Sequence, residues 1–262
     1  MPVPDKNGTG NVAPVQTRVA RIFADPEALS VAAAQRFVDA ATAAISARGR
    51  FCASLSGGST PKRLYQKLVE PSFIDRVDWS KVDLFFGDER CVPRDHPDSN
   101  YRMVHESLFN HAATRQARVF AVPVELAPEK AADAYADMVK HTVPQAIGLP
   151  RFDFMLLGVG ADGHTASLFP GSAALNLRDR LTAAVYSTEK SNWRITLTLP
   201  TINNSAQTLV LLEGIAKAKI VAHLCSGEAP LGWPIEHITP RNTVEWYVDA
   251  AAASEIKARK PV

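Results

Sequence analysis

Residues 154–170 read FMLLGVGADGHTASLFP, and this stretch decides what kind of fold the chain adopts. The mostly apolar run 152–157 is typical of a strand that is buried on both faces. The glycines at 158, 160 and 163 then let the backbone turn sharply and approach a ligand closely. Asp162 and His164 lie in this turn, where the carboxyl end of a parallel strand borders a ligand crevice. A titratable pair at such a place predicts a catalytic site.

The same turn also matches the glycine pattern GxGxxG of a dinucleotide-binding loop. That pattern belongs with a full helix behind it and an acidic residue about 20 positions further on. Here Pro170 and Gly171 follow too soon after the turn, and Glu189 lies beyond that spacing. We therefore expect no nucleotide on this loop.

Composition narrows the class of protein. The chain has 262 residues, 46% of them hydrophobic, and a net charge of +2 from 29 basic and 27 acidic side chains. This balance favours neither nucleic acid nor an anionic membrane as a partner. The three cysteines form no CxxC pair, and no apolar run reaches membrane-spanning length, so we expect a cytoplasmic protein without disulfides or zinc. Residues 1–16 lack periodicity and predict a disordered lead-in.

Strand and helix patterns alternate along residues 17–262, which predicts a single α/β domain around a mostly parallel sheet. Asp25 and Pro26 begin a long helix that Gly49 ends. The pattern predicts strands at 18–23, 51–55, 82–86, 119–122, 152–157, 183–187, 194–199, 208–212 and 244–248, and helices at 26–48, 61–69, 100–109, 128–147 and 214–225.

A second glycine-rich turn, SGGSTP at 56–61, separates a strand from a helix. Gly57 and Gly58 leave the backbone N–H groups at the helix start open to an anion, and Ser59 and Thr60 add hydroxyl donors. The alternative is an ordinary turn in which Ser59 or Thr60 caps the helix. The spacing excludes a Walker A loop. Because two glycines and two hydroxyls coincide, we favour a phosphate site.

The other candidate residues are charged. Asp88, Glu89 and Arg90 follow a buried strand, where paired acids can divide acid and base roles, although a solvated loop or a magnesium site would use the same residues. Arg194 and Lys217 are either surface charges or phosphate ligands. A lone histidine is often structural, so the case for His164 rests on its place in the turn. No metal-ligand spacing such as HExxH is present, and we expect no metal.

Three blocks together resemble the 6-phosphogluconolactonase family: SGGSTP at 56–61, FFGDERCVP at 85–93 with SNY at 99–101, and LGVGADGHTASLFP at 157–170. The resemblance spans roughly residues 19–248, and the blocks occur in the family's order. It implies a modified Rossmann-like α/β/α sandwich, similar to that of glucosamine-6-phosphate deaminase, ribose-5-phosphate isomerase and CoA transferases. It also implies hydrolysis of 6-phospho-D-glucono-1,5-lactone in the oxidative pentose phosphate pathway, without metal or nucleotide cofactor.

By the same resemblance, His164 activates water and Asp162 lies beside it. The candidate residues for binding the sugar phosphate are Gly57, Gly58, Ser59, Thr60, Asp88, Glu89, Arg90, Arg194 and Lys217. The deaminases carry an Asn-Glu pair after the Asp-Gly-His segment, whereas this chain has SLFP at 167–170. Hydrolysis is therefore favoured over a sugar-phosphate isomerase or deaminase, and the retained Asp162 and His164 argue against a non-catalytic sensor.

Overall fold

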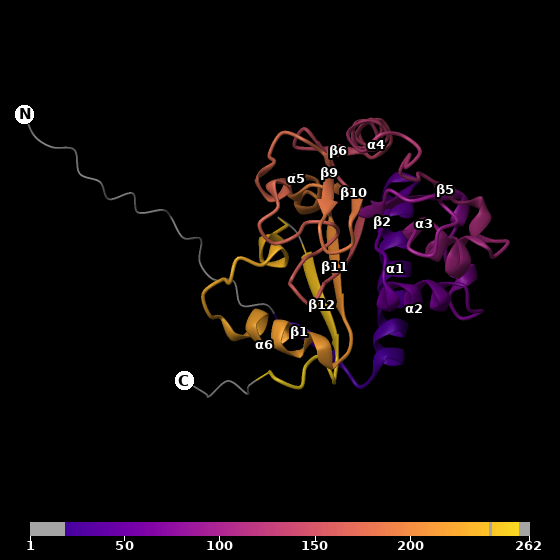
Figure 1. Ribbon diagram of the computed structural model, residues 1–262. Helices are drawn as coiled ribbons and strands as arrows, with labels where there is room; N and C mark the ends of the chain where they lie inside the picture. The colour runs from indigo at the N-terminus through magenta and orange to yellow at the C-terminus, as the bar shows by residue number, and fades with distance from the viewer. Residues whose placement is uncertain (1–18, 241–242, 257–262) are drawn as a thin grey trace, which may run out of the picture.

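The computed structural model describes residues 19–240 and 243–256, so the lead-in predicted for residues 1–16 lies outside the described residues. Within them, seven strands form a wholly parallel sheet in the order β1-β12-β11-β8-β2-β3-β5 (Figure 1). Their bounds are β1 Ala20–Phe23, β2 Phe51–Leu55, β3 Val82–Phe86, β5 Arg118–Val119, β8 Phe154–Gly158, β11 Gln207–Leu212 and β12 Thr243–Asp249.

The centre of this sheet is the pair of strands β2 and β8. Every residue of β2 is buried, as are the first four residues of β8, because helices and loops cover both faces. The chain runs outward from this centre in both directions, through β3 and β5 on one side and through β11 and β12 on the other. The strand order therefore reverses between β2 and β8, which is where open α/β sheets place their ligand crevice.

Helices flank the sheet as the predicted α/β/α class requires. Figure 1 shows α1 and α2 on one side of the sheet and α6 on the other. The bounds of helix α1 agree with those predicted from the sequence. Asp25 accepts a hydrogen bond from the Ala28 amide at its start, and Gly49 ends the helix with a φ of 77°. The helices are α1 Pro26–Arg48, α2 Ser59–Leu68, α3 Asn100–Val104, α4 Pro128–Thr142, α5 Leu199–Asn203 and α6 Ala218–Ser226.

Several connections differ from the expectation. The helix expected at 100–109 is α3 followed by a π-helical stretch, η3 His105–Phe109, and the helix expected to reach residue 147 ends at Thr142. A small hairpin of β6 Gln145–Ala146 and β7 Leu149–Pro150 follows α4. The short 3-10 turns are η1 Ile74–Arg76, η2 Trp79–Lys81, η4 Thr114–Gln116, η5 Ala173–Asn176, η6 Ile215–Lys217 and η7 Pro234–His237.

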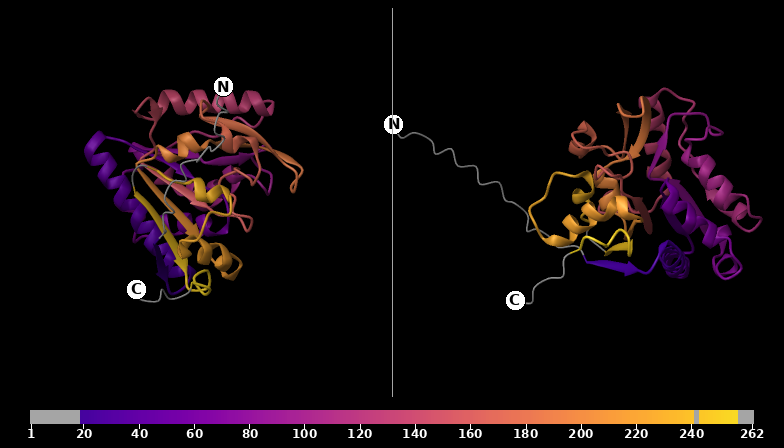
Figure 2. Two further views of the ribbon diagram at one scale, coloured as in Figure 1. Left: turned by 90° about the vertical axis from the view of Figure 1, so that its left-hand side faces the viewer. Right: turned by 60° about the horizontal axis from the view of Figure 1, so that its bottom comes forward.

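A separate antiparallel sheet carries part of the candidate site. It is built from β4 Asp88–Arg90, β10 Asn192–Leu197 and β9 Thr182–Ser187, in that order. The sequence predicts no strand at 88–90, but these residues pair with β10 and form the edge strand of this sheet. Helix α4 packs on β9 and β10 (Figure 2). None of the helices in the described residues combines the length and apolar character needed to cross a membrane.

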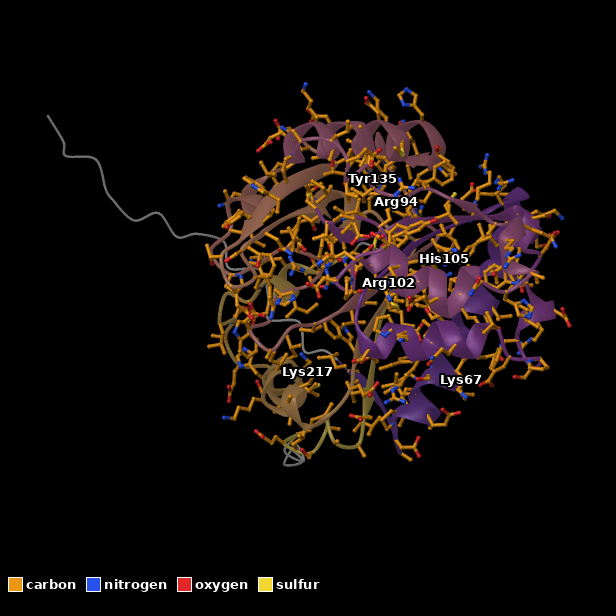
Figure 3. The ribbon with its side chains drawn as sticks, turned by 45° about the vertical axis from the view of Figure 1, so that its right-hand side comes forward. Lys67, Arg94, Arg102, His105, Tyr135 and Lys217 are labelled. Carbon is orange, nitrogen blue, oxygen red and sulfur yellow. The ribbon has the colours of Figure 1, made fainter. Side chains whose placement is uncertain are left out.

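Two buried tyrosines make hydrogen bonds to the backbone at the carboxyl ends of the neighbouring strands β2 and β3. The Tyr65 hydroxyl donates to the Ser56 carbonyl at 2.8 Å and accepts from the Ser56 amide at 3.0 Å, just beyond β2. The Tyr135 hydroxyl makes the same two bonds with Phe86, at 2.8 and 2.7 Å, at the end of β3. Tyr135 reaches from α4 toward the interior (Figure 3). Each tyrosine thus fixes the residue from which a candidate loop departs.

Candidate active site

A pocket of about 230 Å³ opens at the carboxyl ends of β2 and β8, where the strand order reverses. His164 and the 57–60 loop both line it, so the two glycine-rich turns meet in one cavity. The lining also includes Asp88 and Arg90 from the antiparallel sheet, and its full set is Ser56, Gly57, Gly58, Ser59, Thr60, Pro61, Asp88, Arg90, Gly158, Val159, Gly160, His164, Ala166, Arg194, Leu211, Glu213 and Lys217.

The 57–60 loop forms the start of helix α2. Gly58 stands at the N-cap with a φ of 104°, a backbone conformation that favours glycine. The helix therefore begins at Ser59, before the predicted Pro61, and no side chain caps it. This excludes the ordinary turn capped by Ser59 or Thr60. The residues of this helix start line the pocket, and the first turn carries no acidic side chain. An anion is favoured there by both the amides and the helix dipole.

The turn after β8 joins His164 to Asp162. The imidazole Nδ1 lies 2.5 Å from Asp162 Oδ1, which also accepts the His164 backbone N–H at 3.2 Å. Asp162 therefore assigns the proton to Nδ1 and leaves Nε2 as the ring nitrogen able to accept a proton. Gly160 makes this fold possible, because a Cβ there would lie 2.1 Å from His164 Nδ1.

Asp162 itself is not part of the pocket lining and instead borders a second cavity, which residues 169–174 and 183–189 also line. Burial acts to raise the pKa of its carboxyl, but the bonds from the His164 amide and imidazole outweigh this and hold the pKa below its usual value. Asp162 thus stays ionised at neutral pH and orients the imidazole. Phe169 flanks that ring on another side, with the ring centroids 5.0 Å apart.

The two acids of the 88–90 strand take different places. Asp88 lines the pocket, where its carboxylate accepts the Ser167 hydroxyl at 2.6 Å and the Asn100 amide at 3.2 Å. Glu89 faces the other way and accepts the backbone amides of Asn100 and Tyr101 at 2.8 and 2.7 Å, at the start of α3.

Of the predicted substrate-binding residues, Glu89 does not line the pocket, because its carboxylate accepts hydrogen bonds from the start of helix α3. Successive residues of a strand point to opposite sides, so Asp88 and Arg90 share the pocket side while Glu89 does not. Burial raises the pKa of Glu89, although three backbone amides oppose the effect.

Arg90 and Arg194 face each other across the paired strands β4 and β10. Arg194 is only 7% exposed, its guanidinium lies 5.6 Å from the Phe169 ring centroid, and its pKa is lowered first by burial and then by the charge of Arg90. The Nε atoms of both arginines are buried without a hydrogen-bond partner among the described residues. Like charges placed opposite each other repel, so this pair favours an anion in the pocket.

Lys217 reaches the pocket from the turn η6, which follows Gly214. Gly214 has a φ of 89°, and its amide donates to both carboxylate oxygens of the buried Asp249, at 3.0 and 3.1 Å. Burial lowers the pKa of Lys217, and the charge of Asp162 partly opposes this shift. Lys217 and Lys67, which belongs to helix α2, lie on separate parts of the molecule (Figure 3).

Sequence reasoning missed several residues that shape the site. Asn100 enters the sequence analysis only within the SNY segment at 99–101, yet its side-chain amide donates to both the carbonyl and the carboxylate of Asp88. Glu213 lines the pocket and pairs with Arg63 at 3.3 Å, and no spacing signals it. Within the described part of the chain, His, Cys, Asp and Glu side chains form no group of three or more suited to a metal ion.

Comparisons with known proteins identify the family and the fold. Residues 24–246 match the model of the family described as glucosamine-6-phosphate isomerases/6-phosphogluconolactonase. The chain belongs to this family. It is similar to 6-phosphogluconolactonase 3, chloroplastic, of Arabidopsis thaliana, with 34% identity over 95% of this chain and 78% of the relative. It is also similar to 6-phosphogluconolactonase of a Synechocystis strain, with 36% identity over 82% of this chain and 89% of the relative.

Solved structures of family members have the same architecture. The 6-phosphogluconolactonase of Trypanosoma brucei superposes with a TM-score of 0.82 at 28% identity, over 92% of this chain and all of that one. A monomeric glucosamine-6-phosphate deaminase gives a TM-score of 0.76 at 22% identity, which reflects a shared fold.

Proposed function

We propose that this chain is a 6-phosphogluconolactonase, which hydrolyses 6-phospho-D-glucono-1,5-lactone to 6-phospho-D-gluconate. The observation that carries the proposal is the shared pocket, in which an anion cradle and a carboxylate-oriented histidine face the same space. Membership of the family and the lactonase relatives support the same reaction. The protein would act in the cytoplasm as a carboxylic ester hydrolase of the pentose phosphate pathway, without metal or nucleotide cofactor.

The phosphate group would bind to the amides of Gly57–Thr60 and be clamped by Arg194 and Lys217. The helix start supplies neutral donors, while Arg194 supplies positive charge from a buried side chain and Lys217 from a partly buried one. A phosphate there would also relieve the repulsion between Arg194 and Arg90. Binding the non-reacting end of the substrate in this way holds the lactone carbonyl near the 160–164 turn.

His164 would then act as the general base. Its Nε2 takes a proton from a water molecule while the water oxygen attacks C1 of the lactone, and Asp162 stabilises the resulting imidazolium. The negative charge on the carbonyl oxygen is met by backbone N–H groups of a glycine-rich turn or by Arg90. As the tetrahedral intermediate collapses, the C1–ring oxygen bond breaks and His164 returns its proton to the leaving ring oxygen.

The test replaces His164 by Ala. We expect kcat for freshly generated 6-phosphogluconolactone to fall by about 10²–10⁴-fold while KM changes little, because general acid–base catalysis is lost and phosphate binding is kept. Proton release above the spontaneous background measures both constants. An Arg194→Gln variant serves as the matched control, since it should raise KM more than it lowers kcat. An unchanged kcat in the His164 variant would remove this residue from the mechanism.

A sugar-phosphate isomerase or deaminase on this fold would need a base for proton transfer at carbon, and Asp88 is the candidate. Its carboxylate already accepts bonds from Ser167 and Asn100, which favours a positioning role. Incorporation of solvent deuterium at substrate C2 separates the reactions, because lactone hydrolysis breaks no C–H bond. A non-catalytic sensor would bind the sugar phosphate without releasing protons above background.

A further inference from the structure

The segment 228–237 packs against the turn that carries His164. Trp233 lies directly over Gly163, so that a Cβ added at Gly163 would lie 2.6 Å from Trp233 Cγ and 2.7 Å from its Cβ. The Ile235 amide also donates to the Gly163 carbonyl at 3.0 Å. Gly163 separates Asp162 from His164 in the sequence, so both contacts act on the residue between the two members of the pair.

A buried carboxylate organises this segment. Glu236 Oε2 accepts the Trp233 amide at 2.7 Å, and Oε1 accepts the Leu231 amide at 3.1 Å. Its side chain is 6% exposed and pairs with His223 of α6, whose Nε2 lies 3.1 Å from Oε1 and whose side chain is 11% exposed. The His223 ring also meets the Trp233 ring edge to face, with centroids 5.0 Å apart.

These contacts form a chain from helix α6 to the catalytic turn. Helix α6 holds His223, His223 and the backbone amides hold Glu236, Glu236 holds Trp233, and Trp233 covers Gly163. A buried ionisable group is costly unless it is paired and hydrogen-bonded, so a carboxylate committed to two amides and an imidazole fixes this segment in one arrangement. None of these side chains lines the pocket, so their contacts reach His164 only through the turn.

We propose that Trp233 and Glu236 are positioning residues that hold the 160–164 turn, and with it the His164 imidazole, in the geometry needed for catalysis. The inference rests on the proposed role of His164 as general base. A bond between Nδ1 and Asp162 that closes within a five-residue turn depends on the backbone path through Gly163. The indole blocks the space into which this turn would otherwise relax.

The experiment measures kcat and KM for 6-phosphogluconolactone in four full-length variants. In Trp233→Ala, we expect kcat to fall by about 10-fold or more with KM within about twofold, because a misplaced catalytic group costs rate and leaves phosphate binding intact. Trp233→Phe keeps the atoms that cover Gly163 and should restore most of the activity. Glu236→Gln, which loses one acceptor, should lower kcat in the same direction. Leu231→Ala is the matched control, because its side chain in the same segment is 62% exposed.

Melting temperatures separate this role from a purely structural one. The proposal is overturned if Trp233→Ala and Glu236→Gln lower the melting temperature while kcat stays at the wild-type value, or if Trp233→Phe is as impaired as Trp233→Ala. Should Trp233→Ala not fold, Glu236→Gln decides the matter alone. His164→Ala distinguishes the two levels of inference: if it lowers kcat and the Trp233 and Glu236 variants do not, the positioning role fails and the proposed base stands.

Discussion

Replacing Tyr65 by Phe removes one hydroxyl that makes two hydrogen bonds to Ser56. Tyr65 is fully buried, and burial raises the pKa of its phenol, so the group remains a neutral donor and acceptor at any physiological pH. Without it, the Ser56 amide and carbonyl both lose a partner. A buried polar group left unpaired costs about 1–3 kcal/mol. Ser56 borders the pocket, where water can reach part of the backbone. We therefore expect the free energy of unfolding to fall by about 2–3 kcal/mol.

The functional effect should be specific to phosphate binding. Ser56 leads directly into the 57–60 loop, so a loosened Ser56 displaces the amides that form the anion cradle. We expect KM and the inhibition constant of inorganic phosphate each to rise by about 3–10-fold, which corresponds to about 0.7–1.4 kcal/mol, with kcat within about twofold. Urea unfolding and steady-state kinetics measure the two effects.

Tyr135→Phe provides the matched control. It removes the same two bonds from Phe86, at the end of the neighbouring strand β3, which leads toward Asp88 and not toward the cradle. Its loss of stability should be similar, but the inhibition constant of phosphate should stay unchanged. The reasoning is refuted if Tyr65→Phe loses less than about 0.5 kcal/mol, the range of ordinary surface substitutions. It is also refuted if both variants weaken phosphate binding equally.

Two further predictions concern Gly57, in the loop after β2, and Asp83, in β3. Gly57→Ala should lower kcat/KM by about 10-fold or more, because the new Cβ would lie 1.9 Å from Asn100 Oδ1 and displace the side chain that holds Asp88. Adding Asn100→Ala to this variant should cause no further loss of kcat/KM. Fully additive losses in the double variant would contradict the steric cause. Asp83→Asn should cost about 2 kcal/mol of unfolding free energy at pH 7. Burial alone would raise the pKa of Asp83, but its bonds to the partly exposed guanidinium groups of Arg50 and Arg118 hold the pKa below the usual value. The stabilisation from ionised Asp83 is fully present above the unfolded pKa of about 3.9 and is lost as the pH falls through the lower folded pKa. Urea unfolding should therefore show the free energies of unfolding of the two proteins converging below about pH 4. A difference that widens there would contradict the prediction.

The parts of the fold that the sequence predicted are those set by local chemistry. The strand 51–55 is apolar except for Ser54 and matches β2, and Asp25 and Gly49 set the bounds of α1 through a side-chain cap and a left-handed residue. The helix expected to reach 147 ended early, because Ile147 and Gly148 both have positive φ and form the turn of the β6–β7 hairpin. No local signal distinguishes such a turn from the end of an amphipathic helix.

In the candidate site, too, local sequence patterns predicted some residues, and long-range packing determined the others. Glycine-rich turns after buried strands located His164 and the 57–60 loop, because strand ends in a parallel sheet meet at one edge. No local signal shows that Glu89 points away from the pocket, since its orientation depends on the pairing of β4 with β10, which joins residues about a hundred positions apart. Trp233 and Glu236 carried no signal, because their importance comes from packing against a turn some seventy residues earlier in the chain.

The backbone pairing of β2 with β8 has a consequence for how this enzyme can vary. The register places Ala53 beside Phe154 and Ser54 beside Met155, so the main-chain bonds between these two strands set the spacing between the two halves of the cavity. Main-chain bonds are indifferent to side-chain identity. Substitutions, insertions and deletions can therefore accumulate in peripheral segments such as the β6–β7 hairpin while the distance that a six-carbon substrate must bridge stays constant.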